Sequence, residues 1–181
     1  NKYRTSKLNY KYLKYSKFLL DTFIKYGGKN FIGIGTCEEY YKKKFSSNLF
    51  YENSKIKPIN LYAKNKNLFR IYLKSKNINY KWLRFFYLFG EGENHKRLFP
   101  LIIRKINNKN KIKLKYPNFK IDFLYIKTAT KMIRNLIKRK INGEFNICSG
   151  QTIKLNDLAI LNFKKKIISN NYNINSEEIK G

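Results

Sequence analysis

Four short apolar runs, separated by longer segments with helical spacing, constrain the fold of this chain more than any other feature. The runs lie at 30–35, 80–86, 121–126 and 144–150, the last one with its turn. Between them, apolar residues recur every three or four positions, as on one face of an α-helix. Strands that alternate with helices form parallel sheets covered by helices. We therefore predict an α/β fold.

The predicted helices occupy 8–26, 59–76, 98–106, 129–139 and 155–161, and a further short strand occupies 111–114. The first helix carries a stripe of mostly apolar or aromatic residues at helical spacing. The stripe consists of Leu8, Tyr12, Tyr15, Phe18, Leu19, Thr22, Phe23 and Tyr26. This spacing suits a packed face. Gly27 and Gly28 end the helix. The polar segment 37–58 is interpreted as a loop over the site, and the Asn-rich tail after about 164 as frayed.

The net charge of +29 and the 17% aromatic content suggest a nucleic-acid-binding protein. Lysine and arginine neutralise phosphates, and aromatic rings stack on bases. However, the basic residues are spread almost evenly, and Lys, Asn, Ile, Tyr and Phe are the residues that A- and T-rich codons encode. We interpret the charge mostly as genomic base bias and expect no specific nucleic-acid partner, while nucleic-acid binding remains an alternative function.

Two cysteines and the absence of long apolar runs bear on the compartment. No run approaches the ~20 residues of a membrane span, and no signal segment opens the chain. Cys37 and Cys148 lie far apart without a cluster of further ligands, which fits neither a zinc site nor a disulfide framework. We expect a cytoplasmic protein with no membrane partner and no metal site.

Tyr62 and Lys66 stand four residues apart within the helix predicted at 59–76. Residues i and i+4 share a helix face, and a neighbouring ammonium stabilises a phenolate. Such a pair suits proton transfer during redox or isomerisation chemistry at a carbinol. Thr36 lies just beyond the carboxyl end of the strand 30–35, where open α/β sheets bind their ligands. The alternative is a solvated helical face with no chemistry.

Five sequence blocks in a fixed order resemble a known family. They are Gly35-Thr36-Cys37-Glu38-Glu39-Tyr40, Tyr62-x-x-x-Lys66, Leu83-Arg84-Phe85-Phe86-Tyr87-Leu88-Phe89-Gly90-Glu91-Gly92-Glu93, Asp122-Phe123-Leu124-Tyr125-Ile126 and Phe145-Asn146-Ile147-Cys148-Ser149-Gly150. Together they resemble the extended short-chain dehydrogenase/reductases. More narrowly, they are similar to the NAD-dependent epimerase/dehydratase family that modifies nucleotide sugars. The resemblance covers roughly 8–161.

The resemblance implies catalytic roles for Thr36, Tyr62 and Lys66. Tyr62 would exchange a proton with a sugar hydroxyl, and Lys66 would bind the nicotinamide ribose and lower the Tyr62 pKa. Thr36 would hydrogen-bond the reacting oxygen. The implied cofactor is NAD or NADP, with Gly35 beside Tyr62 and Lys66 as a cofactor-binding position.

The implied substrate is a nucleotide sugar, with Glu38, Tyr87 and Arg97 as substrate-binding residues. Glu38 falls where dehydratase members carry a carboxylate used in water elimination. The alternative for Glu38 is a solvated loop carboxylate.

The implied fold is a Rossmann-like parallel sheet flanked by helices, here its second half, plus part of a small C-terminal substrate-binding domain. Residues 1–90 would be the NAD-binding half with the Tyr62 and Lys66 helix. Residues 91–181 would be mainly substrate-binding, with 121–140 returning to the Rossmann-like sheet. In the complete protein, the helix 8–26 and the Tyr62 helix would form a homodimer interface.

The family begins with a strand and a Gly-x-x-Gly-x-x-Gly turn, which holds the dinucleotide pyrophosphate at a helix N-terminus. No such turn occurs in this sequence. We therefore expect an incomplete chain that needs an N-terminal segment to bind NAD or NADP. The alternative within the same fold is a noncatalytic remnant that serves binding or dimerisation.

Overall fold

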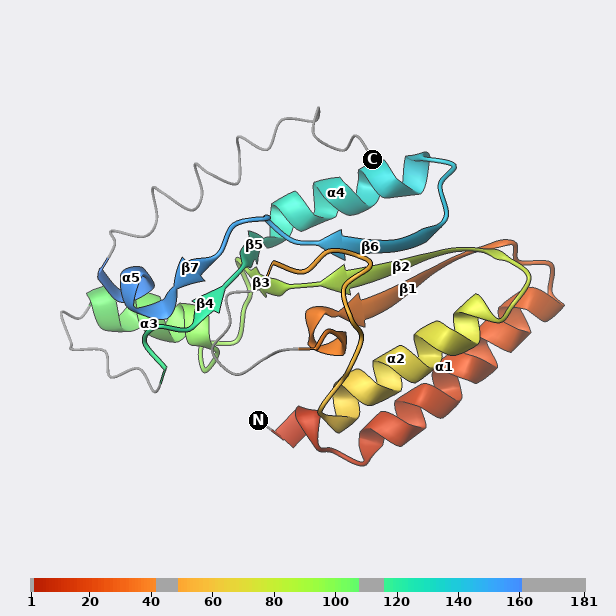
Figure 1. Cartoon of the computed structure of the whole chain (residues 1–181), viewed down its shortest axis with the longest axis horizontal. Helices are drawn as coiled ribbons and strands as arrows, with labels where there is room; N and C mark the ends of the chain where they lie inside the picture. Colours follow the sequence, from red (N-terminus) through yellow and green to blue (C-terminus); the bar gives the residue numbers. More distant parts are fainter. Residues whose placement is uncertain (1, 42–48, 108–115, 161–181) are drawn as a thin grey trace. The chain divides into compact units, whose positions relative to one another are not determined.

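The computed structural model describes residues 2–41, 49–107 and 116–160, and these fall into two compact units (Figure 1). The first unit runs to Phe86 and includes Arg139–Ile147. The second comprises Tyr87–Lys138 and continues from Cys148. No helix in the described ranges is long and apolar enough to cross a membrane.

A three-stranded parallel sheet forms the centre of the first unit. Its strands are β1 (Asn30–Thr36), β2 (Asn79–Phe85) and β6 (Gly143–Ile147), in the order β1-β2-β6. Both pairings are parallel, and Leu83 of β2 lies opposite both Ile34 and Phe145. The predicted α/β fold with a parallel sheet is confirmed.

Helices α1 (Leu8–Lys25) and α2 (Leu61–Lys74) lie side by side and pack on one face of this sheet (Figure 1). Their shared core contains Leu20, Phe69, Leu73 and Trp82. Gly33 of β1 makes this packing possible, because a Cβ there would collide with the Trp82 ring. The large indole therefore fills the space between the sheet and α2.

Most of the apolar stripe predicted to pack along α1 faces outward instead, whereas Phe23 packs against Phe31 of β1 with ring centroids 5.6 Å apart. Tyr12 and Phe18 are 66% and 69% exposed, while Leu20 is fully buried. Leu13 and Ile24 accompany Leu20 in the core. The helix thus has a second, narrower apolar stripe that contacts α2 and the sheet, and the sequence pattern did not show which stripe would be buried.

Strand β1 is covered on one face only. Gly33 is buried, whereas Ile32 and Ile34 are 36% and 48% exposed. The sequence indicated a buried strand because the run is continuously apolar. Within the described residues, β1 is an edge strand of its sheet, and its pattern alternates like that of a half-buried strand.

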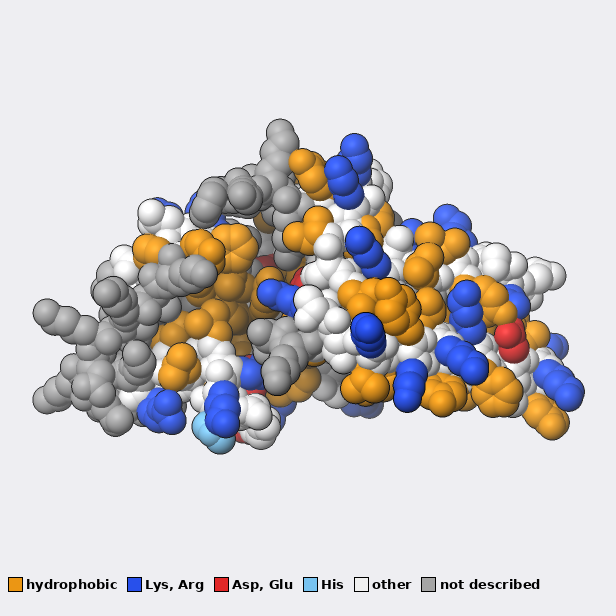
Figure 2. All heavy atoms as spheres, turned by 90° about the horizontal axis from the view of Figure 1, so that it is seen from below, with side chains coloured by type: hydrophobic (Ala, Val, Ile, Leu, Met, Phe, Trp, Pro, Cys, Tyr) orange, Lys and Arg blue, Asp and Glu red, His pale blue; other side chains and the backbone are white. Residues whose placement is uncertain are grey.

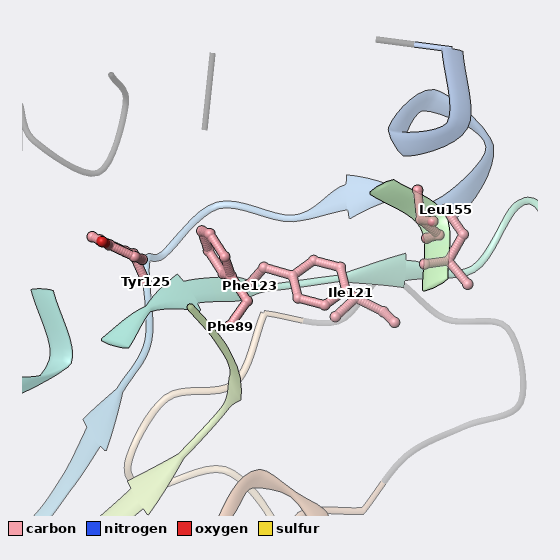
Figure 3. Packing of buried hydrophobic residues seen from close by; sticks show 6 residues of the cluster. Phe89, Ile121, Phe123, Tyr125 and Leu155 are labelled. Carbon is pink, nitrogen blue, oxygen red and sulfur yellow. The ribbon is translucent and has the colours of Figure 1, made fainter. Parts of the chain in front are cut away.

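In its described residues, the second unit contains two small sheets and three helices. Strand β3 (Tyr87–Phe89) pairs in parallel with β5 (Phe123–Tyr125), and β4 (Lys120–Ile121) pairs antiparallel with β7 (Ile153–Lys154). The helices are α3 (Leu98–Asn107), α4 (Ile126–Lys138) and α5 (Leu155–Ile160). Phe89, Ile102, Ile121, Phe123, Tyr125 and Leu155 form the buried cluster of this unit (Figure 3).

The strand predicted at 121–126 is divided at Asp122. The Asp122 carbonyl accepts a hydrogen bond from the Tyr87 N–H at 3.3 Å, and its carboxylate accepts from the N–H and hydroxyl of Ser149 at 2.9 and 2.8 Å. The two halves consequently pair with different strands, and α4 begins at Ile126 rather than at 129. The third strand of the main sheet comes from Gly143–Ile147, not from the segment 121–140.

The segment between β1 and α2 is more ordered than a plain loop. It contains a 3-10 helix, η2 (Cys37–Glu39), and an antiparallel bridge between Tyr40 and Ile56. The predicted strand at 111–114 and the tail after 164 lie outside the described residues.

Candidate active site

Thr36 ends β1 and caps η2 through a reciprocal pair of hydrogen bonds. Its hydroxyl oxygen accepts from the Glu38 N–H at 3.3 Å, and its own N–H donates to the Glu39 carboxylate at 2.9 Å. This arrangement is a capping box, which satisfies backbone groups at a helix N-terminus. The capping box therefore holds the Thr36 side chain in place at the carboxyl end of β1.

Helix α2 brings Tyr62 and Lys66 to the same place. Asn60 caps this helix, since its side-chain oxygen accepts from the Ala63 N–H at 2.9 Å. Tyr62 and Lys66 follow in the first two turns, and the Lys66 Nζ lies 5.9 Å from the centroid of the Tyr62 ring. The Thr36 side chain lies within reach of the Tyr62 hydroxyl, since as a polar partner it lowers the pKa of Tyr62. The three residues predicted as catalytic therefore cluster around one phenol.

The electrostatic environment of Tyr62 differs from the expected one. Burial raises its pKa to about 12, and Tyr3 and Glu38 add to the rise, while the nearby Thr36 side chain opposes it. We expected Lys66 to lower this pKa. In the structure, burial and the nearby carboxylate outweigh any such effect, so Tyr62 is a neutral phenol at pH 7.

Lys66 is partly buried, and burial lowers the pKa of its ammonium, while Glu39 opposes that change. Within the described part of the chain, its Nζ takes part in no hydrogen bond or ion pair. Three N–H donors are thus available for hydroxyl acceptors, such as the paired hydroxyls of a ribose. The donor set of Lys66 fits the nicotinamide ribose that the resemblance implies.

Glu38 is held by donors from three residues and is only 11% exposed at its side chain. Arg4 Nη2 lies 2.6 Å from its Oε1, and the Tyr3 hydroxyl donates to the same oxygen at 3.3 Å. Asn60 Nδ2 donates to its Oε2 at 2.6 Å. The interpretation of Glu38 as a solvated loop carboxylate is therefore wrong.

Gly35 lies directly against buried side chains. A Cβ at this position would lie 2.6 Å from Glu39 Oε1 and even closer to the Trp82 indole. Glycine at 35 thus permits the close approach of Trp82 and Glu39 to β1. We expected Gly35 to serve the cofactor, and its packing against Trp82 is a structural role beside that expectation.

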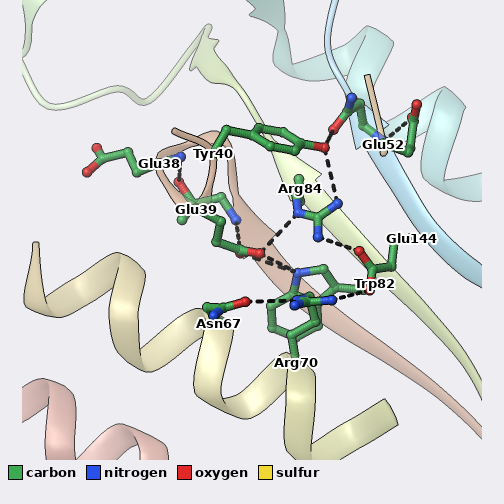
Figure 4. Close-up of polar contacts among 11 residues, drawn as sticks. Glu38, Glu39, Tyr40, Glu52, Asn67, Arg70, Trp82, Arg84 and Glu144 are labelled. Carbon is green, nitrogen blue, oxygen red and sulfur yellow. Dashed lines mark hydrogen bonds and ion pairs between the residues drawn. The ribbon is translucent and has the colours of Figure 1, made fainter. Parts of the chain in front are cut away.

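A buried network that the sequence analysis missed lies beneath Thr36 (Figure 4). Glu39 accepts from Arg84, which also binds Glu144, and Glu144 in turn binds Arg70 of α2. One available signal was the Thr36-x-x-Glu39 spacing, which is typical of a capping box. The roles of Tyr3 and Arg4 had no such signal, because they depend on contacts between distant parts of the chain.

Tyr87 and Arg97, expected to bind substrate, belong to the second unit. The Tyr87 ring lies 6.2 Å from the Phe123 ring, against the buried cluster of that unit. Arg97 is 63% exposed and pairs with Glu93 at 3.1 Å. Among the residues that the structure describes, no group of three His, Cys, Asp or Glu side chains could hold a metal ion.

The chain is similar to known proteins over most of its length. The NAD dependent epimerase/dehydratase family model matches residues 3–148. No curated protein matches the chain. Among solved structures, it is similar to UDP-N-acetylglucosamine 4-epimerase from Methanobrevibacter ruminantium in complex with UDP-N-acetylmuramic acid, with 23% identity and a TM-score of 0.71. That match covers 80% of this chain and 49% of the other.

Two further structures are similar to a comparable degree. UDP-N-acetylglucosamine 4-epimerase from Bacillus cereus has 25% identity and a TM-score of 0.70, covering 83% of this chain and 53% of that one. TunA, an NAD-dependent NDP-hexosamine 5,6-dehydratase involved in tunicamycin biosynthesis, has 23% identity and a TM-score of 0.69, covering 81% and 50%. The chain spans about half the length of these structures. The match of the family model over most of its length shows that the chain belongs to the NAD-dependent epimerase/dehydratase family.

Proposed function

We propose that this chain carries the proton-transfer site of an NAD- or NADP-dependent nucleotide-sugar epimerase, dehydratase or reductase. The observation that carries the proposal is the cluster of Thr36, Tyr62 and Lys66 at the carboxyl end of β1, with the Lys66 Nζ 5.9 Å from the centroid of the Tyr62 ring and Thr36 close enough to lower the Tyr62 pKa. A phenol, a hydroxyl and an ammonium at this edge of a parallel sheet suit oxidation of a secondary alcohol.

In this proposal, Tyr62 exchanges a proton with the reacting sugar hydroxyl, and Thr36 orients the oxygen through its own hydroxyl. An alcohol loses hydride readily only if its proton also leaves, so the two transfers are coupled. The nicotinamide, when bound, supplies the hydride acceptor and donor. Lys66 binds its ribose hydroxyls, and its positive charge beside the Tyr62 ring favours the phenolate during turnover.

The cofactor and substrate classes are inferred from the family and from similar proteins. TunA is NAD-dependent and acts on an NDP-hexosamine, and the Methanobrevibacter epimerase was solved with a UDP-sugar. We propose that Gly35 lies beside the cofactor and that Glu38, Tyr87 and Arg97 face the substrate. Because the chain spans about half of those proteins, dinucleotide binding is proposed to need a segment that this sequence lacks.

The experiment is a turnover assay of the protein purified from cells that express the native gene. It is assayed with NAD or NADP and a panel of UDP- and TDP-sugars. Tyr62→Phe removes only the phenolic hydroxyl, so kcat is expected to fall by roughly 100-fold or more. Tyr51→Phe is the matched control, because Tyr51 is 63% exposed and lies outside the cluster. Unchanged turnover in Tyr62→Phe would refute the mechanism, and a folded protein inactive with every sugar would favour the noncatalytic alternative.

We also propose that the complete protein is a homodimer through the outer face of α1. Leu8, Tyr12, Tyr15, Leu19 and Tyr26 are between 53% and 80% exposed and recur every three, four or seven positions. Figure 2 shows such apolar side chains interspersed with lysines over the helices at the right of the view. A stripe of this size on a helix is typical of an interface rather than of a solvated surface.

A cytoplasmic location is proposed from the cysteines. Cys37 and Cys148 lie far apart in the sequence without a cluster of further ligands, and this cysteine usage suits a reducing compartment. Cell fractionation tests this location. Recovery of the protein from the periplasm or the medium would contradict it.

A further inference from the structure

Glu39 is a fully buried carboxylate on which three donors converge. The Thr36 N–H donates to its Oε1 at 2.9 Å, and Arg84 Nε donates to its Oε2 at 3.0 Å. The Trp82 indole N–H lies 3.1 Å from Oε2 and 3.3 Å from Oε1. Both Glu39 and Arg84 are 0% exposed, so their charges are balanced within the protein rather than by water.

The charges continue from Arg84 across the sheet to α2. Arg84 on β2 also binds Glu144 on β6, and Glu144 binds Arg70 on α2 (Figure 4). Arg70 lies one turn beyond Lys66 and two turns beyond Tyr62 on the same helix. The alternating charges therefore connect the end of β1 to the helix that carries the phenol.

We propose that Glu39 is a positioning residue that fixes the Thr36 hydroxyl relative to Tyr62 through its hydrogen bond with the Thr36 N–H. This inference rests on the proposed function of Thr36 and Tyr62. Glu39 accepts a hydrogen bond from the backbone N–H of Thr36, so a shift of the carboxylate moves the residue whose side chain lies close enough to Tyr62 to lower its pKa. Glu39 acts through Thr36 and binds neither substrate nor cofactor.

The donor pattern demands a carboxylate at this position. An amide offers one acceptor oxygen and one NH2 group, which only donates. Whichever way the new amide in Glu39→Gln were turned, its NH2 group would face either the Thr36 N–H or the Arg84 and Trp82 donors. The substitution therefore keeps the shape of the side chain but breaks one side of the arrangement.

The test compares Glu39→Gln with Asp157→Asn, a matched change of an exposed carboxylate. Amide hydrogen exchange at Thr36 reports the hydrogen bond directly, and it is expected to become roughly 10-fold faster in Glu39→Gln while the β1 amides keep their protection. Trp82 is the single tryptophan, so a shift of its emission reports the loss of its partner. In the natively expressed protein, kcat is expected to fall by roughly 10- to 100-fold with an unchanged KM.

A second variant separates positioning from simple destabilisation. In Glu39→Gln/Arg84→Met, the guanidinium donor is gone, so the amide oxygen can accept from Thr36 and Trp82 together. The protection of the Thr36 amide is expected to return. At least half of the loss in log kcat is expected to return with it, even though Arg84 is also a buried residue. If the single variant does not fold, the double variant is compared directly with wild type.

Two results would overturn the proposal. One is a folded Glu39→Gln protein whose Thr36 exchange and kcat equal those of wild type. The other is a double variant that regains Thr36 protection without regaining kcat, because Glu39 would then be only structural. Failure of the proposed function is distinguishable, since Tyr62→Phe would then retain turnover whatever the exchange at Thr36.

Discussion

Tyr3 packs edge-on against Tyr62, with ring centroids 5.2 Å apart and ring planes at 85°. The Tyr3 hydroxyl donates to Glu38 at 3.3 Å, so one carboxylate lies near both phenols. Its negative charge raises the pKa of both tyrosines, in addition to the larger effect of burial. The pKa of Tyr62, the proposed proton-transfer residue, is therefore set partly by Tyr3, near the start of the chain, and by Glu38.

Glu38→Gln is expected to lower the pKa of Tyr62 below its value of about 12, because a neutral amide no longer disfavours the phenolate. The measurement is an NMR titration of protein labelled at the tyrosine Cζ carbon, with the Tyr62 signal assigned from Tyr62→Phe. Asp157→Asn serves as the control and should leave the Tyr62 titration curve unchanged. A Tyr62 pKa that rises or stays constant in Glu38→Gln would contradict this account.

The raised pKa of Tyr62 also predicts how stability depends on pH. The phenol titrates near 10 in the unfolded chain and at about 12 in the folded protein. The folded state therefore holds this proton more tightly, and its contribution is complete below pH 10 and is lost as the pH rises toward 12. The expected loss from Tyr62 is on the order of 2 kcal/mol.

Urea unfolding of wild type and Tyr62→Phe between pH 9 and 12, followed by Trp82 fluorescence, isolates this contribution from the titration of lysines. The stability difference between the two proteins should shrink or change in favour of the variant as the pH rises. Tyr51→Phe should follow wild type throughout. If the stability advantage of wild type over Tyr62→Phe grew with pH, the predicted pH dependence of the Tyr62 contribution would be wrong.

The buried ion pairs should dominate the response to substitutions of cationic residues. Arg84→Met leaves Glu39 buried without its cation, and breaking such a pair costs about 3–5 kcal/mol. Lys127→Met is the control for a surface pair, because Lys127 and its partner Glu91 are 65% and 66% exposed at their side chains. Its expected cost is much smaller, because water screens both charges. Equal losses of unfolding free energy in the two variants, measured in urea, would refute the ranking.

The sequence was sufficient to predict most of the elements and the grouping of Thr36, Tyr62 and Lys66, because both depend on local patterns. The period of the apolar residues gave α2, and the i, i+4 spacing placed Tyr62 and Lys66 on one of its faces. The position of Thr36 followed from where the strand ends. Each of these conclusions requires only the geometry of one element and the rule for ligands at parallel sheets.

Other features depend on contacts that no local pattern encodes. Helix α1 has two apolar stripes, and only packing against Phe69 and Trp82 decides that Leu20 lies inside. The direction of the Tyr62 pKa likewise depends on Tyr3 and Glu38, which are 59 and 24 residues away in sequence. Taken alone, the Tyr62 and Lys66 pair predicts a lowered Tyr62 pKa. Burial, which raises that pKa, depends on how the whole unit packs and is not visible in the pair.

Gly35→Ala is expected to disturb the site through packing. The added methyl group would meet the Trp82 indole and Glu39, so the cost is about 1–3 kcal/mol, accompanied by a shift in Trp82 emission. In Gly150→Ala, by contrast, the Cβ meets no atom, but φ is +72°. This control should cost about 1 kcal/mol and leave the emission unchanged. Wild-type emission in a folded Gly35→Ala protein would contradict the predicted contact.

The outer face of α1 leads to the final prediction, which concerns the proposed homodimer. Tyr15 is 61% exposed at the middle of the stripe, and lysines flank it along the helix. Tyr15→Lys adds a cation at an interface where like charges already face each other, so it should raise the dimer dissociation constant by at least roughly 10-fold. Sedimentation equilibrium of the natively expressed protein measures this constant.

The charge of the stripe makes the same prediction testable with salt. Because screening weakens repulsion between the lysines of two copies, dimerisation of wild type should strengthen between about 0.05 and 0.5 M NaCl. Ile137→Lys is the control, since Ile137 is 59% exposed on α4 and outside the stripe. It should leave the dissociation constant unchanged. A wild-type monomer at every salt concentration, or equal weakening by the two lysines, would show that α1 is not the interface.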